Sequence, residues 1–186
     1  MIIIKGKVVV ISGPSGVGKS TIVKCIMDTI DAKYSVSTTT RQPRKGEVNG
    51  VDYFFVTEKE FKRKEKNGEF LETNLYEGNY YGSSKEAVYN MINAGTNVLF
   101  EVDVNGAYNI KKIFPDALLI YIAPPSIEEL RQRLIDRATE PIERINERME
   151  ITNEELKRID FYDYVIVNVE LDKAIEETKK LILKKI

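Results

Sequence analysis

The sequence contains no histidine and no tryptophan, and it has a single cysteine, Cys25. Without histidine there can be no Ser-His-Asp triad, no histidine metal site and no histidine general base. One cysteine cannot form an intrachain disulfide or a cysteine-based zinc site. Phosphoryl transfer depends mainly on positioning and charge neutralisation, so it needs neither histidine nor a cysteine metal site. We expect Cys25 itself to be a small buried apolar residue.

The chain also lacks a long hydrophobic run, a strong net charge and a recognisable targeting segment. Its apolar runs have the length of strands, so no membrane span is predicted. Residues 1–5 are too short for a signal peptide and contain no cleavage site, so we expect a cytoplasmic protein. With 186 residues and a net charge of −1, we expect one domain that does not bind nucleic acid.

What the sequence does contain is a phosphate-binding motif near its start. Residues 8–12 are a β-branched run typical of a buried strand, and apolar residues recur at helical spacing over residues 22–30. Between them the chain reads G-x-x-x-x-G-K-S, from Gly13 to Ser20. The glycines let several backbone N–H groups point at one anion beside the positive end of a helix. Lys19 adds a charge for the β- and γ-phosphates, and the Ser20 hydroxyl can ligate Mg²⁺.

The rest of the chain alternates between strand-like and helical segments, which predicts an α/β fold with a parallel sheet and helices on both faces. Core strands are expected at residues 97–103, 117–122 and 164–167. Core helices are expected at residues 106–114, from Ser126 to a break at residues 138–141, at 143–159, and after an N-cap at Asp172.

Residues 34–95 interrupt this alternation. Strands are expected at residues 34–40, 52–56 and 70–76, with two helices closed by Gly68 and Gly95. We interpret this block as a small sheet-rich insertion between two units of the α/β core.

Two arginines and two tyrosines of the insertion form a candidate site, Arg41, Arg44, Tyr53 and Tyr81. Forked guanidinium donors beside phenol hydroxyls suit a second phosphate group. The alternative is a solvated loop beside ordinary core tyrosines, and the spacing does not decide between the two.

A second set of arginines flanks the break at residues 138–141, and it comprises Arg133, Arg137, Arg144 and Arg148. Like charges four residues apart destabilise a bare helix by about 0.2–0.5 kcal/mol, and an anion bound between the helices would reverse that sign. The alternative is that Glu140, Glu143 and Glu147 neutralise them, and taken alone the pattern slightly favours that alternative.

Two carboxylates, Glu101 and Asp103, alternate with apolar residues at the end of a predicted strand. Ligands of open α/β sheets bind at the carboxyl ends of strands. A carboxylate there can hold water on Mg²⁺ or accept a hydrogen bond from a base N–H. The alternative, that an acid caps the Asn105-Gly106 turn, suits one of the pair better than both.

Taken in order, several segments resemble the guanylate kinase family over nearly the whole chain. They are the P-loop, residues 37–41 with Arg44, 46–47, 50 and 52–54, residues 70–72 with 78–83, residues 101–107 with 125–126, the pair 133–134 with Arg137 and Arg148, and residues 165–168. The P-loop alone is generic. Its combination with Ser37, Arg41, Arg44, Glu72 and Tyr81 is specific.

The resemblance implies one domain with a P-loop NTPase-type parallel sheet flanked by helices, a sheet-rich GMP-binding insertion and a helical lid. The core would comprise residues 1–34, 96–130 and 150–186, the GMP-binding part 35–95, and the lid 131–149. The implied reaction is ATP + GMP ⇌ ADP + GDP with Mg²⁺, in purine nucleotide metabolism, with ATP and GMP as the partners. The alternatives are a P-loop kinase with another acceptor and a non-catalytic protein-interaction module of the same fold.

The resemblance also implies roles for individual residues. Catalytic roles would fall to Lys19, Arg41, Arg133, Arg137 and Arg148. ATP would be bound by Gly13, Pro14, Ser15, Gly16, Val17, Gly18, Lys19, Ser20, Thr21 and Asn168. Guanine would be read by Ser37, Glu72, Ser83 and Asp103, and the GMP phosphate held by Arg41, Arg44, Tyr53 and Tyr81. Mg²⁺ would bind Ser20, with Glu101 or Asp103 acting through water.

Overall fold

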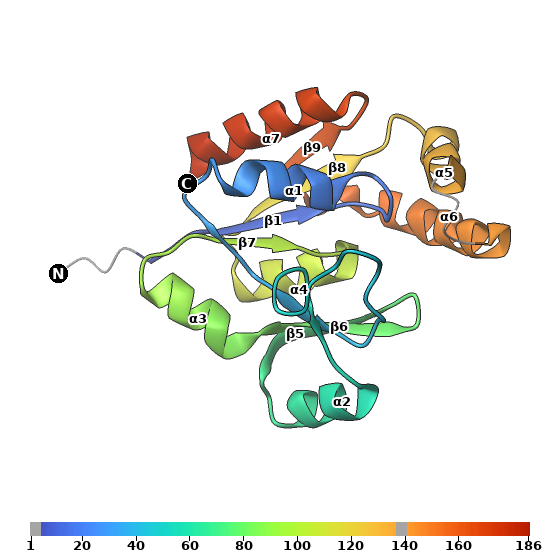
Figure 1. Ribbon diagram of the computed structural model, residues 1–186. Helices are drawn as coiled ribbons and strands as arrows, with labels where there is room; N and C mark the ends of the chain where they lie inside the picture. Colours follow the sequence, from blue (N-terminus) through green and yellow to red (C-terminus); the bar gives the residue numbers. More distant parts are fainter. Residues whose placement is uncertain (1–4, 137–140) are drawn as a thin grey trace.

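A computed structural model of the chain describes residues 5–136 and 141–186. Its centre is a five-stranded parallel sheet in the order β2-β7-β1-β8-β9 (Figure 1). The strands are β1 (Val8–Ser12), β2 (Lys33–Tyr34), β7 (Val98–Glu101), β8 (Leu118–Ala123) and β9 (Tyr164–Val167). The predicted parallel α/β core is confirmed.

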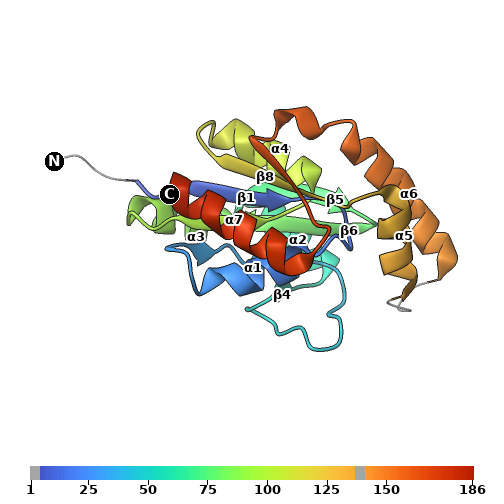
Figure 2. The same cartoon turned by 90° about the horizontal axis from the view of Figure 1, so that it is seen from above.

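Helices cover both faces of this sheet because each buried strand sends alternate side chains to opposite sides. In β1, Val9 and Ile11 belong to one hydrophobic cluster, whereas Val8 and Val10 belong to the other. Helices α1 (Lys19–Met27) and α7 (Leu171–Lys185) contribute to the first cluster, and α3 (Lys85–Asn93) and α4 (Val104–Ile113) contribute to the second. Figures 1 and 2 show these pairs on opposite sides of the strands.

A second, four-stranded sheet lies beside the core, in the order β4-β3-β6-β5. Its strands are β3 (Ser37–Thr39), β4 (Phe54–Phe55), β5 (Phe70–Tyr76) and β6 (Asn79–Ser84). Helix α2 (Glu58–Lys66) packs on it through Phe61, whose ring stacks against Phe70 and Tyr80 at centroid distances of 4.6 and 5.4 Å. The insertion therefore has its own sheet, which faces the P-loop side of the core.

Two helices extend beyond the carboxyl ends of the core strands, α5 (Ile127–Asp136) and α6 (Ile142–Leu156) (Figure 1). They join the core through Leu130, Leu134, Ile145 and Met149, which are buried in the same cluster as α1. Arg137 and most of the predicted break lie outside the described residues. In the two described stretches, no helix has both the length and the apolar character needed to cross a membrane.

Two predictions about single residues are wrong. Cys25 is exposed, because α1 buries the face that carries Ile22, Val23 and Ile26 and Cys25 lies off that face. Asp172 is not an N-cap, since α7 already begins at Leu171 and the Asp172 side chain lies in the first turn.

Three predicted segments also have different boundaries. The strand expected at residues 34–40 is divided between β2 and β3, which belong to different sheets. The helix expected at 106–114 begins two residues earlier, because Asp103 caps it through the Gly106 N–H. The helix expected at 143–159 ends at Leu156 and is followed by a separate 3-10 turn, η1 (Ile159–Phe161).

Candidate functional site

A cavity of about 340 Å³ lies between the P-loop and the second sheet. Fifteen residues that the sequence had singled out line it: Gly13, Ser15, Gly16, Gly18, Lys19, Ser20, Thr21, Ser37, Arg41, Arg44, Tyr53, Glu72, Tyr81, Glu101 and Asp103. They come from the P-loop and the first turn of α1, from the end of β7 and the residues after it, from β3, β5 and β6, and from the loop between β3 and β4. The carboxyl edge of the core sheet is the usual ligand position in such folds.

The P-loop has the backbone shape that the glycine pattern predicts. Gly13, Gly16 and Gly18 all have φ in the left-handed region, at 144°, 89° and 105°. A Cβ at Gly13 would lie 2.3 Å from the Ile122 carbonyl oxygen, so this position admits only glycine. The loop then delivers the first N–H groups of α1 to the cavity, where an anion is favoured.

The Lys19 ammonium folds back into this loop. Its Nζ donates to the carbonyl oxygens of Gly13 and Pro14, at 2.5 and 2.9 Å. Burial lowers the pKa of Lys19, and the negative charges of Glu101 and Glu155 oppose that shift. The lysine is thus a cation held beside the anion-binding loop by carbonyl groups that a phosphate can replace.

Ser20 and Glu101 meet at the edge of the cavity, with the serine hydroxyl donating to Glu101 Oε1 at 2.6 Å. Burial raises the pKa of Glu101, and the nearby Lys19 charge counteracts it. No cluster of three His, Cys, Asp or Glu side chains suited to a metal occurs in residues 5–136 and 141–186. A hydroxyl beside one carboxylate still fits Mg²⁺, which takes few protein ligands and keeps water and phosphate oxygens around it.

Three polar residues form one row across the second sheet. The register pairs Ser37 of β3 with Ser83 of β6, and Ser83 in turn with Glu72 of β5. The Ser83 hydroxyl donates to Glu72 Oε1 at 2.8 Å. Burial raises the pKa of Glu72 to about 7; the Ser83 hydrogen bond opposes this rise and the charge of Asp103 adds to it. The row provides two hydroxyls and a partly desolvated carboxyl group.

Arg41 and two tyrosines line another part of the cavity. The Arg41 guanidinium lies 5.3 Å from the centre of the Tyr53 ring, and Tyr53 contacts Tyr81 edge to face at 6.0 Å. Glu47 fixes Arg41 through an ion pair of 2.8 Å and also accepts from the Arg44 backbone N–H at 2.7 Å. All four residues of the predicted cluster therefore line one cavity, and Arg44 lies in an exposed part of its loop.

Arg148 of α6 reaches the P-loop, although it does not line the cavity. Its Nη1 donates to Ser15 Oγ at 2.7 Å, and its Nη2 lies 2.9 Å from Glu77 Oε2. Only 8% of Arg148 is exposed. Glu77 occupies the turn between β5 and β6, with φ of 49°. Arg148 therefore connects α6 with the P-loop and with the β5–β6 turn.

The other described arginines of α5 and α6 that the sequence analysis named have different surroundings. Arg133 Nη2 donates to the Asn168 carbonyl at 3.0 Å, and the Asn168 amide donates to the Val17 carbonyl of the P-loop at 2.8 Å. Arg144 pairs with Glu147 at 3.0 Å on the exposed side of α6. Of the glutamates named in the alternative, Glu147 pairs with Arg144, whereas Arg148 pairs with Glu77 and Arg133 with Glu129.

The two carboxylates at the end of β7, Glu101 in the strand and Asp103 just beyond it, have separate partners. Glu101 binds Ser20, whereas Asp103 accepts from the Gly106 N–H at 2.8 Å through Oδ1 and from Asn74 Nδ2 at 2.5 Å through Oδ2. The capping alternative therefore holds for Asp103 and not for Glu101. Burial raises the pKa of Asp103, and the Gly106 and Asn74 donors oppose that rise.

Sequence reasoning missed Glu47, Asn74, Glu77 and Glu155 as parts of this site. Glu155 is a buried carboxyl of α6 whose pKa is raised to about 7 by burial, with Lys19 counteracting. The position of Glu47 in the arginine-rich loop was a usable signal. The partners of Asn74 and Glu77 lie 29 and 71 residues away along the chain, and only the fold brings them together.

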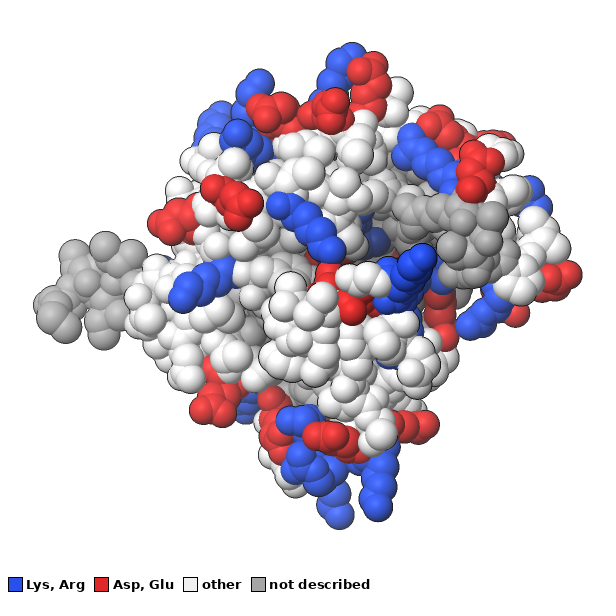
Figure 3. Space-filling model, in the orientation of Figure 1, with Lys and Arg blue, Asp and Glu red and all other residues white. Residues whose placement is uncertain are grey.

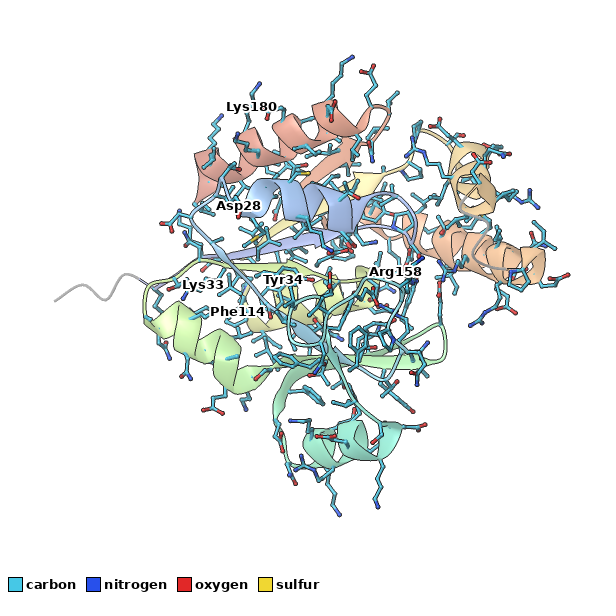
Figure 4. All side chains as sticks on the ribbon, viewed as in Figure 1. Asp28, Lys33, Tyr34, Phe114, Arg158 and Lys180 are labelled. Atoms are coloured by element: carbon cyan, nitrogen blue, oxygen red, sulfur yellow. The ribbon has the colours of Figure 1, made fainter. Side chains whose placement is uncertain are left out.

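The surface shown in Figure 3 carries acidic and basic side chains interspersed, without a broad region of one sign. Figure 4 shows the many side chains that lie between the core and the second sheet, with Arg158 labelled near the end of α6. Arg158 Nη1 donates to Asn105 Oδ1 at 2.6 Å, so a residue beyond α6 also contacts the segment after β7.

Comparisons with known proteins agree with one another. The family model described as guanylate kinase matches residues 5–185. A curated guanylate kinase of Shouchella clausii (strain KSM-K16) is 43% identical over 179 residues, which cover 96% of this chain and 87% of the relative. A crystal structure of guanylate kinase from Anaplasma phagocytophilum matches with a TM-score of 0.83 at 31% identity, covering 100% of this chain and 89% of that one. TT1252 from Thermus thermophilus, at 15% identity and a TM-score of 0.58 over 98% of both chains, shares the fold.

Proposed function

Since the chain belongs to the guanylate kinase family, and is therefore an enzyme that transfers the γ-phosphoryl group of ATP to GMP, we propose how its residues divide that task. The carrying observation is that one cavity is lined by the P-loop, by Ser37 and Glu72 of the polar row, and by the cluster of Arg41, Arg44, Tyr53 and Tyr81. In this proposal ATP lies on the P-loop and GMP on the second sheet, so that their phosphates meet near Lys19.

The GMP phosphate itself supplies the nucleophile. Its second pKa is about 6, so one of its oxygens is largely ionised at neutral pH. That oxygen attacks the γ-phosphorus, the bond to the β–γ bridging oxygen breaks, and ADP leaves with that electron pair. No protein base is needed, which agrees with the absence of histidine. The protein aligns two polyanions and offsets their charge.

The P-loop and Asn168 are assigned to ATP, with Lys19 on the β- and γ-phosphates. The Asn168 side-chain amide donates to the Val17 carbonyl, and the Asn168 backbone carbonyl accepts from Arg133. Arg41, Arg44, Tyr53 and Tyr81 are assigned to the GMP phosphate, and Ser37, Glu72, Ser83 and Asp103 to guanine. Arg133, Arg137 and Arg148 are assigned to the transferring phosphoryl group, where cationic donors are most effective.

Mg²⁺ belongs to the proposal as the metal that accompanies ATP. Ser20 would hold it, with Glu101 through water, and the Ser20–Glu101 hydrogen bond shows the two groups within reach of a common ligand. When bound, the metal supplies charge neutralisation at the phosphate oxygens.

Three wider expectations remain part of the proposal. The chain is divided into a core (1–34, 96–130 and 150–186), a GMP-binding part (35–95) and a lid (131–149). Its partners are small molecules rather than nucleic acid, which the net charge of −1 and the interspersed charges on the face shown in Figure 3 support. It works in the cytoplasm.

Replacing Arg148 with alanine is expected to lower kcat about 10²-fold while raising KM for GMP less than threefold. An arginine that acts on the transferring group stabilises the transition state more than it stabilises bound GMP. Removing one such donor lowers kcat on the order of 10²-fold. The measurement is steady-state ADP release with varied GMP.

Arg144→Ala is the matched control, since Arg144 lies on the exposed side of the same helix in an i,i+3 pair with Glu147. It should leave kcat within about twofold, because exposed pairs of this type contribute little. An Arg148→Ala enzyme with wild-type kcat would assign Arg148 to structure alone.

GMP affinity is expected to fall as the pH drops below about 7. The pKa of Glu72 is raised to about 7 from its ordinary value, so acidification protonates it. A protonated carboxyl group loses acceptor capacity toward the N–H groups of guanine, and the apparent Kd should rise toward tenfold per pH unit. Calorimetric titration of GMP from pH 5.5 to 8 measures this.

The GMP phosphate titrates in the same range, so the comparison must be made with Glu72→Gln. That variant keeps the phosphate titration and loses the carboxyl titration. Wild type should show the steeper pH dependence, and parallel curves for the two proteins would contradict the role of Glu72.

A further inference from the structure

Asn74 lies beside the proposed guanine-reading row but was not part of it. It is two residues beyond Glu72 on β5, so both side chains point to the same face of the sheet. The register pairs Asn74 with Tyr81, as it pairs Glu72 with Ser83. Both Glu72 and Asn74 line the cavity.

The contact with Asp103 fixes which end of the Asn74 amide is left for a ligand. Asn74 Nδ2 lies 2.5 Å from Asp103 Oδ2, and Asp103 Oδ1 already accepts from the Gly106 N–H. An ionised carboxylate only accepts hydrogen bonds, so the amide must turn its NH₂ group toward Asp103. Asn74 Oδ1 then points elsewhere, and it has no hydrogen-bond donor among residues 5–136 and 141–186.

We propose that Asn74 Oδ1 accepts a hydrogen bond from the 2-amino group of guanine, which makes Asn74 a specificity-determining residue for GMP against IMP. The proposal rests on the assignment of Glu72 to the same base. Guanine presents three N–H hydrogens along one edge, one on N1 and two on the 2-amino group. Glu72 Oε1 already accepts a hydrogen bond from Ser83. A further acceptor beside Glu72 can therefore bind an N–H hydrogen of guanine that Glu72 leaves without a partner.

Hypoxanthine has the same N1–H and O6 as guanine and differs only in lacking the 2-amino group. IMP would therefore satisfy Glu72 but would lack the hydrogen bond that guanine gives to Asn74 Oδ1. That hydrogen bond favours GMP alone, whereas a Glu72 contact to N1–H is common to both nucleotides. The two residues are thus assigned different parts of the same edge of the base.

The test compares kcat/KM for GMP and IMP in an ADP-release assay. Asn74→Ala should reduce the GMP/IMP ratio of kcat/KM about tenfold, mainly because kcat/KM for GMP falls. Asn74→Ser is a second variant in case the alanine variant folds poorly. Thr73→Ala is the control on the same strand, since Thr73 points to the other face and bonds Glu65 at 2.9 Å. It should leave the ratio unchanged. Thermal unfolding verifies that each variant is folded.

A double-mutant cycle separates direct contact from an effect through Asp103. Asp103→Asn keeps a good helix cap, and the loss of ratio caused by Asn74→Ala should persist in that background. A loss that disappears there, an unchanged ratio, or an equal loss for GMP and IMP would each overturn the proposal. Glu72→Gln tests the assignment of Glu72 to guanine separately, because it should lower kcat/KM for GMP and for IMP together.

Discussion

Replacing Lys19 with alanine is expected to lower kcat by about 10³-fold or more, while the Kd for GMP changes less than threefold. Lys19 opens α1 at the end of the P-loop, and its ammonium group lies on the Gly13 and Pro14 carbonyls. When ATP is bound, the same charge can turn to the β- and γ-phosphates, where negative charge builds up during transfer. GMP lies on the other sheet in our proposal, so its affinity has little dependence on Lys19.

The measurements are steady-state ADP release and calorimetric titration of GMP without ATP. Lys173→Ala is a suitable control, because Lys173 is an exposed residue of α7 that pairs only with Glu170 among its described contacts. It should change neither quantity by more than about twofold. A loss of GMP affinity as large as the loss of rate would place Lys19 in the GMP site instead.

The core of the fold could be predicted because local patterns and tertiary structure agree there. The β-branched run of β1, the glycine loop and the apolar face of α1 each indicate the same strand–loop–helix unit. The errors lie where local composition is not decisive. Cys25 was assigned by residue type, but its position on the helix wheel sets its exposure. Residues 34–40 are strand formers throughout, and only the sheet topology shows that they serve two sheets.

The site could be predicted as far as charge type and spacing carry information. Gly13 to Ser20 are contiguous, so their joint role is readable from the chain alone. Ser37 and Glu72 are far apart in sequence, and they were grouped only through the family resemblance. Asn74 and Glu77 depend on the β5–β6 register and on the position of α6, which no local pattern encodes. The roles of Asn74 and Glu77 depend on the residues that contact them in the folded protein, and not on the residues next to them in the sequence.

Glu72 carries the second large expected effect, which concerns base specificity. Wild type is expected to prefer GMP to AMP by roughly 10⁴-fold in kcat/KM, and Glu72→Gln to reduce that ratio by about 10²-fold. Guanine offers N–H donors where adenine has an unprotonated N1, so a carboxylate facing that edge meets an acceptor when AMP binds. The desolvated surroundings that raise the pKa of Glu72 also make such an unpaired charge costly.

Glutamine keeps the shape of the side chain but replaces one acceptor oxygen with a donor NH₂ group. That NH₂ group can meet the adenine N1 lone pair, so AMP should gain while GMP loses, and KM for GMP should rise. Ser83 remains able to donate to the glutamine oxygen, as it now donates to Glu72 Oε1 at 2.8 Å. Ser37, Asn74 and Asp103 remain in place, so some preference for GMP should survive.

The control is Glu69→Gln, the same chemical change at a residue that forms only surface pairs with Arg63 and Lys64 and a hydrogen bond to Asn67 among the described side chains. Its GMP/AMP ratio should equal that of wild type. If Glu72→Gln is folded and keeps the wild-type ratio as well, Glu72 does not read the base. The row of Ser37, Ser83 and Glu72 would then be a structural feature of the second sheet, and specificity would have to come from Asp103 and its neighbours after β7.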